Sequence, residues 1–178
     1  MNCAVEIDTL QQGGGTSQEQ AMALFDQLEP VPTAFMLGKW KGKGFNTQHR
    51  MDGLLEAYDW HGKVFESTES VHPLVFARGD GFVKLNPIWF PLKFAKTTKL
   101  SVSPFAKKAF KLATYFLFTK KPRARLRMTE YRGKTSATMV YDQQPINDVF
   151  RKIDDNTVMG VMDAKGMSQP FFFILERE

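Results

Sequence analysis

The C-terminal third of the chain is a series of short strand-like segments joined by tight turns. The segments lie at 123–131, 134–141, 149–153, 158–162 and 171–177. The clearest is 123–131, where arginine alternates with other residues and gives the period of two typical of a β-strand. Connections such as Arg132-Gly133 are too short to hold a crossover helix, so neighbouring strands must run antiparallel.

The N-terminal half repeats this pattern at 38–45, 63–67, 74–78 and 82–86. Together the segments predict a mainly β fold, a closed up-and-down antiparallel barrel of about eight or nine strands with a few short helices. One helix is expected to begin at Ser17, which with Gln20 forms a capping-box pattern, and a brief one is expected at 51–58.

A chain of 178 residues predicts a single domain. Gly13-Gly14-Gly15 predicts a flexible leader over 1–16, followed by the barrel domain over 17–178. The N-terminus resembles no secretory signal, and no apolar run reaches the roughly 18 residues of a membrane span, so a cytoplasmic location is expected. The single cysteine, Cys3, excludes an internal disulfide.

The positive charge of the chain is concentrated in one stretch. Although the net charge is only +5, no Asp or Glu occurs between Gly81 and Thr129. Its basic residues are Lys84, Lys93, Lys96, Lys99, Lys107, Lys108, Lys111, Lys120, Lys121, Arg123, Arg125 and Arg127. Such a stretch attracts anions, whether lipid head groups, a fatty carboxylate, a phosphate or nucleic acid.

Part of this stretch, 88–118, predicts a basic amphipathic insertion that covers one end of the barrel like a lid. Ser103-Pro104 is a typical helix start. In a helix, the apolar residues Phe105, Ala109, Leu112 and Phe116 would share one face. The end of 105–118 would also suit a strand, so the choice between helix and strand stays open. An anionic membrane surface is one partner that this insertion could meet.

Strand parity predicts a contact between the first and last barrel strands. Gly38, Trp40 and Gly42 share one face of their strand, opposite the alternating lysines, so Trp40 should point inward. The two strands are neighbours in a closed barrel. Arg177 can therefore lie across the Trp40 ring and bond to carbonyls of the preceding turn, Thr33 to Leu37.

A helical turn, a G-x-W strand start and a C-terminal arginine resemble the signature of the calycin superfamily, which includes lipocalins and fatty-acid-binding proteins. More closely, Gly38-Lys39-Trp40-Lys41-Gly42 resembles the GXWXG-motif family of uncharacterised proteins. The residues from Met139 to Arg177 resemble that family's second block, a domain of unknown function. The usual T-G-H after the first strand of the family is Thr47-Gln48-His49 here. The resemblance implies a lipocalin-like barrel and almost no biochemistry.

The leading hypothesis is that the barrel binds a hydrophobic, anionic small molecule, such as a fatty acid or a lipid. The 16 phenylalanines can line a cavity as well as fill a core. Candidate lining residues are Trp89, Phe94, Phe116, Tyr141, Phe150, Phe171 and Phe173. Arg123, Arg125 and Arg127 share one strand face. Facing inward, they would form the carboxylate or phosphate trap that the resemblance to fatty-acid-binding proteins implies; facing outward, they would form a solvated patch.

An enzyme, an isomerase or cyclase acting on an apolar substrate in the barrel, is the second hypothesis. It needs a titratable residue inside, and the candidates are His49, His72, Asp142 and Asp163. The spacing of the three histidines predicts no metal site. No cofactor is expected, although a single histidine could ligate haem. Nucleic-acid binding through the basic stretch is a further alternative, without any recognition motif to support it.

Overall fold

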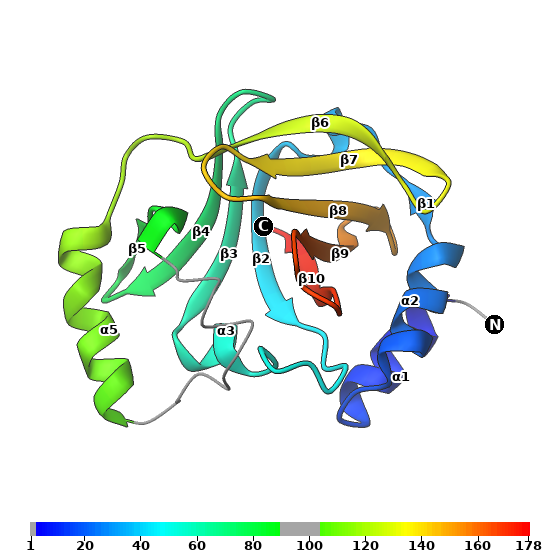
Figure 1. Ribbon diagram of the computed structural model, residues 1–178, viewed down its shortest axis with the longest axis horizontal. Helices are drawn as coiled ribbons and strands as arrows, with labels where there is room; N and C mark the ends of the chain where they lie inside the picture. The colour runs from blue at the N-terminus through cyan, green and yellow to red at the C-terminus, as the bar shows by residue number, and fades with distance from the viewer. Residues whose placement is uncertain (1–2, 90–103) are drawn as a thin grey trace.

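The computed structural model describes residues 3–89 and 104–178. They form a closed barrel of eight antiparallel strands with two additional strands and a few short helices, which confirms the predicted fold class (Figure 1). The barrel strands are β2 (Gly38–Gly44), β3 (Trp60–Phe65), β4 (Val71–Arg78), β6 (Ala124–Tyr131), β7 (Lys134–Tyr141), β8 (Ile146–Lys152), β9 (Thr157–Ala164) and β10 (Phe171–Arg177). Each pairs with the next, and β10 pairs with β2 to close the ring.

The two additional strands extend the barrel at its sides. β1 (Glu29–Pro30) pairs with β8, and β5 (Gly81–Lys84) pairs with β4. The helical segments are α1 (Cys3–Gln12), α2 (Gln18–Gln27), η1 (Thr33–Met36), α3 (Leu54–Ala57), η2 (Pro87–Trp89) and α5 (Pro104–Leu117). Most of the segment 105–118, for which the sequence allowed a helix or a strand, lies in the helix α5. No helix in the described ranges is long and apolar enough to cross a membrane.

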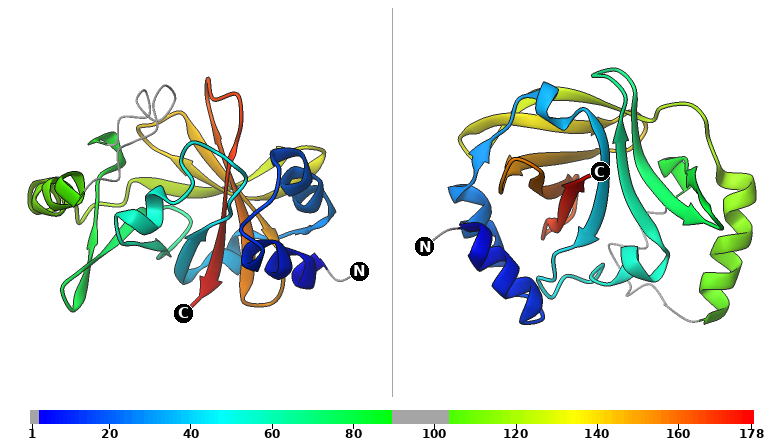
Figure 2. Two further views of the ribbon diagram at one scale, coloured as in Figure 1. Left: turned by 90° about the horizontal axis from the view of Figure 1, so that it is seen from below. Right: turned by 180° about the vertical axis from the view of Figure 1, so that it is seen from behind.

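Helices α1 and α2 pack side by side against the outside of the barrel (Figure 2). The sequence predicted a flexible leader over 1–16, whereas most of this segment is the helix α1. Its Ile7 is buried with Phe25 of α2 and Phe172 of β10, so burial of apolar surface accounts for its order. The helix predicted from Ser17 is confirmed, because the Ser17 side chain accepts a hydrogen bond from the Gln20 amide.

The last strand separates two apolar cores. Phe171, Phe173 and Leu175 point into the barrel, where they join the interior core. Phe172 and Ile174 point outward into the core beneath α1 and α2. This double coverage explains why β10 is apolar at consecutive positions instead of alternating.

The predicted contact between Trp40 and Arg177 is present. The two residues are cross-strand partners, and the Arg177 guanidinium lies 4.2 Å from the centre of the Trp40 ring. It donates hydrogen bonds to the carbonyl oxygens of Phe35 (2.7 Å) and Leu37 (3.0 Å). The buried indole donates to the Met36 carbonyl at 2.8 Å. Both side chains thus fasten the η1 turn onto the closed end of the barrel.

We expect Arg177→Met to lower the free energy of unfolding by about 2 kcal/mol, because it removes the ring contact and both donors while it keeps the bulk. Arg177→Lys should recover only part of this, since an ammonium cannot lie flat on the indole and donate in two directions. Urea denaturation measures both. Lys43→Met is the control: Lys43 pairs with Glu176 on the surface, so its loss should cost less than about 0.5 kcal/mol. Equal effects of the two methionine variants would contradict the assignment.

Candidate functional site

A bulge in β3 places a lysine inside the barrel. The pairing of β3 with β4 is irregular between Trp60 and Val64, so Trp60 and Lys63 are both buried although they are three residues apart. Gly62 sits at this irregularity with a φ of +152°, and a Cβ there would lie only 1.9 Å from the Trp40 carbonyl oxygen. A residue with a side chain therefore cannot replace Gly62 without moving β2 or β3.

Lys63 forms an ion pair in the barrel interior with Asp148 of β8. The Lys63 Nζ lies 2.8 Å from the Asp148 Oδ2, and both side chains are almost completely buried. Lys63 also donates to the Pro73 carbonyl oxygen at 3.2 Å. The Tyr141 hydroxyl donates to the same Asp148 oxygen at 3.5 Å. We call Lys63, Asp148 and Tyr141 the interior polar cluster.

Aromatic rings surround the charged end of Lys63. Its Nζ is 5.0 Å from the ring centre of Phe173, 5.5 Å from that of Trp60 and 5.9 Å from that of Tyr141. These electron-rich faces stabilise a cation in an apolar interior. The ammonium is therefore held by one carboxylate, one carbonyl and three rings.

Burial changes the acid–base properties of the cluster. It raises the pKa of Asp148, and the opposing effects of Lys63 and Tyr141 do not cancel it. Burial, followed by the nearby Asp148 charge, also raises the pKa of Tyr141 well above its usual range. The tyrosine thus remains a hydrogen-bond donor, and burial makes protonation of Asp148 easier than that of an exposed carboxylate.

Two polar atoms of this region lack a hydrogen-bond partner within the described residues. They are the second carboxylate oxygen of Asp148, Oδ1, and the indole nitrogen of Trp60. A buried polar atom without a partner costs about 1–3 kcal/mol. One of the two is an acceptor and the other a donor, and both belong to residues in contact with Lys63. A polar group that satisfied both atoms would have to donate to Asp148 Oδ1 and accept from the Trp60 indole.

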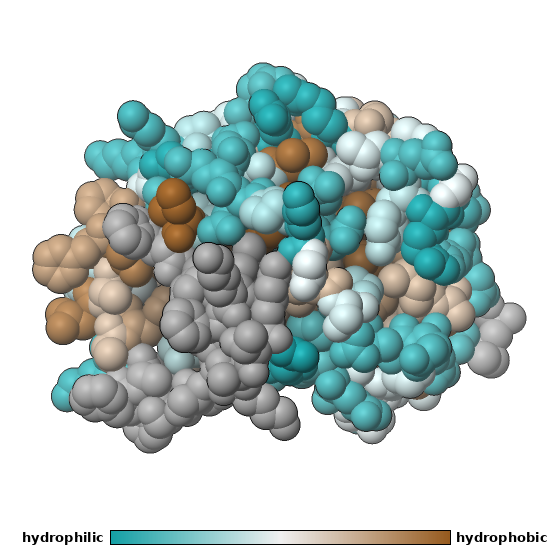
Figure 3. All heavy atoms as spheres, viewed as in Figure 1, coloured by the Kyte–Doolittle hydropathy of each residue, from teal (hydrophilic) through white to brown (hydrophobic). Residues whose placement is uncertain are grey.

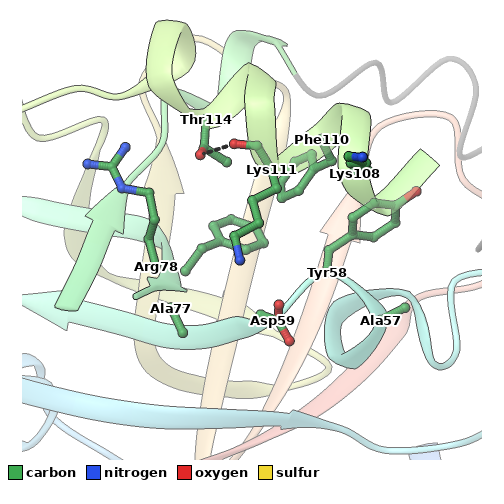
Figure 4. Close-up of a pocket in the computed structure, with 10 residues that line it drawn as sticks. Ala57, Tyr58, Asp59, Ala77, Arg78, Lys108, Phe110, Lys111 and Thr114 are labelled. Atoms are coloured by element: carbon green, nitrogen blue, oxygen red, sulfur yellow. Dashed lines mark hydrogen bonds between the residues drawn. The ribbon is translucent and has the colours of Figure 1, made fainter. Parts of the chain in front are cut away.

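A second feature is a pocket of about 230 Å³ between α5, α3 and β4 (Figure 4). Its lining residues are Ala57, Tyr58, Asp59, Phe76, Ala77, Arg78, Lys108, Phe110, Lys111 and Thr114. The Phe110 ring packs edge-on against Tyr58 at 4.7 Å and against Phe76 at 5.3 Å. Phe76 belongs to the interior core and is the cross-strand partner of Trp60. Aromatic residues therefore lead from the pocket to the interior polar cluster.

The aromatic residues predicted to line the barrel differ in position. Tyr141, Phe150, Phe171 and Phe173 all belong to the interior core. Phe116 does not, because it lies on the face of α5 that points into solvent. The Trp89 side chain and Phe94 lie outside the described residues.

Arg123, which precedes β6, and Arg125 and Arg127 of β6 do not line the interior. Leu126 and Ala124 occupy the inner face, and this parity turns the arginines outward. Each has an outer-surface partner: Arg123 donates to Gln143, Arg125 lies 3.8 Å from Asp142, and Arg127 pairs with Glu69 at 2.8 Å. They form the solvated patch instead of a carboxylate trap.

The four candidate titratable residues are not brought together. His49 is buried beside Phe171, and its Nδ1 accepts a hydrogen bond from the Met51 amide. His72 is buried with Glu66 as its partner at 3.1 Å. Burial lowers the pKa of both histidines. Asp142 and Asp163 are exposed. The described residues hold no group of three or more His, Cys, Asp or Glu that could bind a metal ion.

Sequence reasoning missed Lys63 and Asp148 as site residues, although strand parity carried a signal for each. Lys63 shares its parity with the buried Phe65, and Asp148 shares its parity with Ile146 and Phe150. A charged residue on the apolar face of a strand is the pattern that would have selected both.

The fold and the cluster define a closed β-barrel protein with a charged pair enclosed by aromatic side chains. Residues 23–81 match the family described as GXWXG protein, and residues 122–177 match a domain of unknown function, DUF4334. A crystal structure of a protein from Thermomonospora curvata is similar, with 32% sequence identity and a TM-score of 0.72 over 100% of this chain and 99% of that one. The chain therefore contains a GXWXG domain, as the motif predicted, followed by a DUF4334 domain. No curated protein matches it.

A double-mutant cycle tests the energetics of the buried pair. We expect Asp148→Leu alone, or Lys63→Met alone, to lower the free energy of unfolding by about 3 kcal/mol or more, because each leaves the other charge of the pair buried and uncompensated. The double variant Lys63→Met/Asp148→Leu should be close to the parent protein or more stable, since it replaces a desolvated ion pair by apolar packing. Urea denaturation gives all four values. A double variant less stable than either single one would contradict this account.

Proposed function

We propose that the barrel binds a small, mainly apolar molecule and holds the polar head group of this molecule at the interior polar cluster. The single observation that supports this proposal most strongly is the pair of unpartnered buried atoms, Asp148 Oδ1 and Trp60 Nε1. An apolar surrounding with a few placed polar groups is typical of small-molecule sites. Phe171, Phe173 and Phe150 supply such a surrounding. A calycin-like relationship, predicted from the G-x-W motif and Arg177, accords with a ligand carrier.

The charge of the cluster limits the head group. Asp148 already neutralises Lys63, so a bound carboxylate would leave one uncompensated negative charge in the interior. A proton on Asp148 removes this excess, and the raised pKa of Asp148 makes its protonation accessible. A fatty acid would then bind together with one proton, whereas a fatty alcohol would bind without one.

Dodecanoic acid, dodecanol and dodecane test the proposal, because they share one chain and differ in the head group. We expect native mass spectrometry of delipidated protein to show one bound acid or alcohol and little alkane. Titration calorimetry in two buffers of different ionisation enthalpy should show uptake of about one proton with the acid and none with the alcohol.

Lys63→Met/Asp148→Leu is the matched variant, because it keeps an apolar interior. It should lose the preference for the two polar ligands over dodecane. Equal binding of all three ligands by the parent protein, or acid binding without proton uptake, would contradict the proposed role of the cluster.

A second candidate function is proton transfer on an apolar substrate. The observation that favours it is the hydrogen-bonded chain from Tyr141 through Asp148 to Lys63, because a buried carboxylate with a raised pKa suits a general acid or base. Proton exchange between deuterated water and a bound cyclic ketone, followed by mass spectrometry, would reveal such a step. Asp148→Asn should then abolish exchange and retain ketone binding. Exchange that persists in this variant would exclude Asp148 as the acid or base.

A further inference from the structure

Helix α5 carries large apolar side chains on the face that points away from the barrel. Its inner face holds the buried Thr114 and the partly buried Phe110, which packs on Phe76 and Tyr58. On the outer side, 65% of Leu112, 58% of Tyr115 and 82% of Phe116 is exposed. Phe116, which was predicted to line the ligand site, and Leu112, which was predicted to share its helical face, therefore point away from the barrel. Phe110 makes the contact with the barrel side instead, against Tyr58 and Phe76.

The exposed residues continue beyond the helix. Phe118, which follows the helix, is 54% exposed, and Figure 3 shows apolar residues gathered over α5 at this edge of the molecule. We define Leu112, Tyr115, Phe116 and Phe118 as the α5 face. Contiguous apolar residues on a surface mark a contact with another body, because their hydration is unfavourable.

Basic groups flank the α5 face. Lys108 and Lys111 are exposed on the side of the helix that borders the pocket, which Asp59 also lines, and Lys120 and Lys121 follow the C-terminal end of the helix. Arg78 adds its guanidinium 4.7 Å from the Tyr115 ring. The sequence from Gly81 to Thr129 contains no acidic residue that would reduce this charge. Aromatic and aliphatic groups bordered by lysines are typical of helices that lie in the interface of an anionic membrane.

We propose that the α5 face docks the barrel onto an anionic lipid bilayer. The 14 residues of α5 are too few to span the hydrocarbon layer, so the helix lies along the surface with its outer side chains inserted. The lysines then meet lipid phosphates. A second copy of this chain fits the face less well, because it would bring the same positive charge against it. This proposal does not depend on ligand binding in the interior.

Flotation with vesicles tests the docking. We expect the protein to float with phosphatidylcholine vesicles that contain phosphatidylglycerol, and to bind pure phosphatidylcholine vesicles at least about tenfold less. Lys108→Gln/Lys111→Gln should weaken binding to the anionic vesicles by about fivefold for each lysine. Leu112→Ser/Phe116→Ser should also reduce binding by more than about tenfold, because it removes the inserted groups.

Matched controls distinguish binding through the α5 face from nonspecific adsorption of exposed apolar or positively charged side chains. Val5→Ser removes an exposed apolar side chain on α1, across the barrel from α5, and should leave binding unchanged. Lys39→Gln/Lys41→Gln removes two exposed lysines of β2 and should change binding less than about twofold. Circular dichroism verifies folding of each variant, which is expected because all replaced side chains are exposed.

Four results would overturn the proposal. One is equal binding of the parent protein to neutral and anionic vesicles. Another is undiminished binding by Leu112→Ser/Phe116→Ser. The third is a dimer of the parent protein in sedimentation equilibrium, with Leu112→Ser/Phe116→Ser monomeric and neither protein bound to vesicles. This result would assign the α5 face to a contact with a second copy of the chain. Salt-sensitive binding to DNA that depends on the same lysines, without vesicle binding, would assign the charge to nucleic acid.

Discussion

The closure of the barrel depends on the pairing of β2 with β10. The Arg177 side chain on β10 stabilises this pairing through its contacts with Trp40 of β2 and with the η1 turn. Its guanidinium covers the Trp40 ring and at the same time binds the carbonyl groups of the η1 turn. A closed ring has no free strand edge, so every other strand acquires two neighbours once this pair forms. The interior can then exclude water, and only an interior of this kind makes a buried ion pair and a raised pKa of Asp148 possible.

The interior polar cluster joins the two halves of the chain. Lys63 lies in the segment that matches the GXWXG family, whereas Asp148 and Tyr141 lie in the segment that matches DUF4334. Likewise, Trp40 lies in the GXWXG match and Arg177 lies in the DUF4334 match. The two matched segments are thus complementary parts of one barrel, and neither can complete a ring or neutralise its buried charge alone. A head-group site built across this junction forms only when the whole barrel has folded.

Strand periodicity predicted the barrel and the Trp40–Arg177 contact, because both follow from alternation along single strands. It failed where a second layer covers the outside. On β8, Asp148 lies on an apolar face as its parity indicates, but Arg151 is buried on the opposite face beneath α2, so parity alone does not show which of the two charged residues points inward. The β3 bulge reverses parity at Gly62, which a period of two cannot represent. The sequence did not show which face of α5 packs on the barrel, because Phe110 on one face and Phe116 on the other are equally suited to burial.

The insertion that carries α5 lies between β4 and β6, which share the fewest paired residues of any two neighbouring barrel strands. In the described structure β4 and β6 face each other through one residue pair, Val71 and Ala124, and the segment between the two family matches, 82–121, lies outside both. Within this segment Val83 and Leu85 are buried in the interior core, whereas the exposed side chains of α5 take no part in the eight-stranded ring. A change of the exposed side chains of α5 would therefore alter what the barrel can contact while it leaves the enclosed Lys63–Asp148 pair in place.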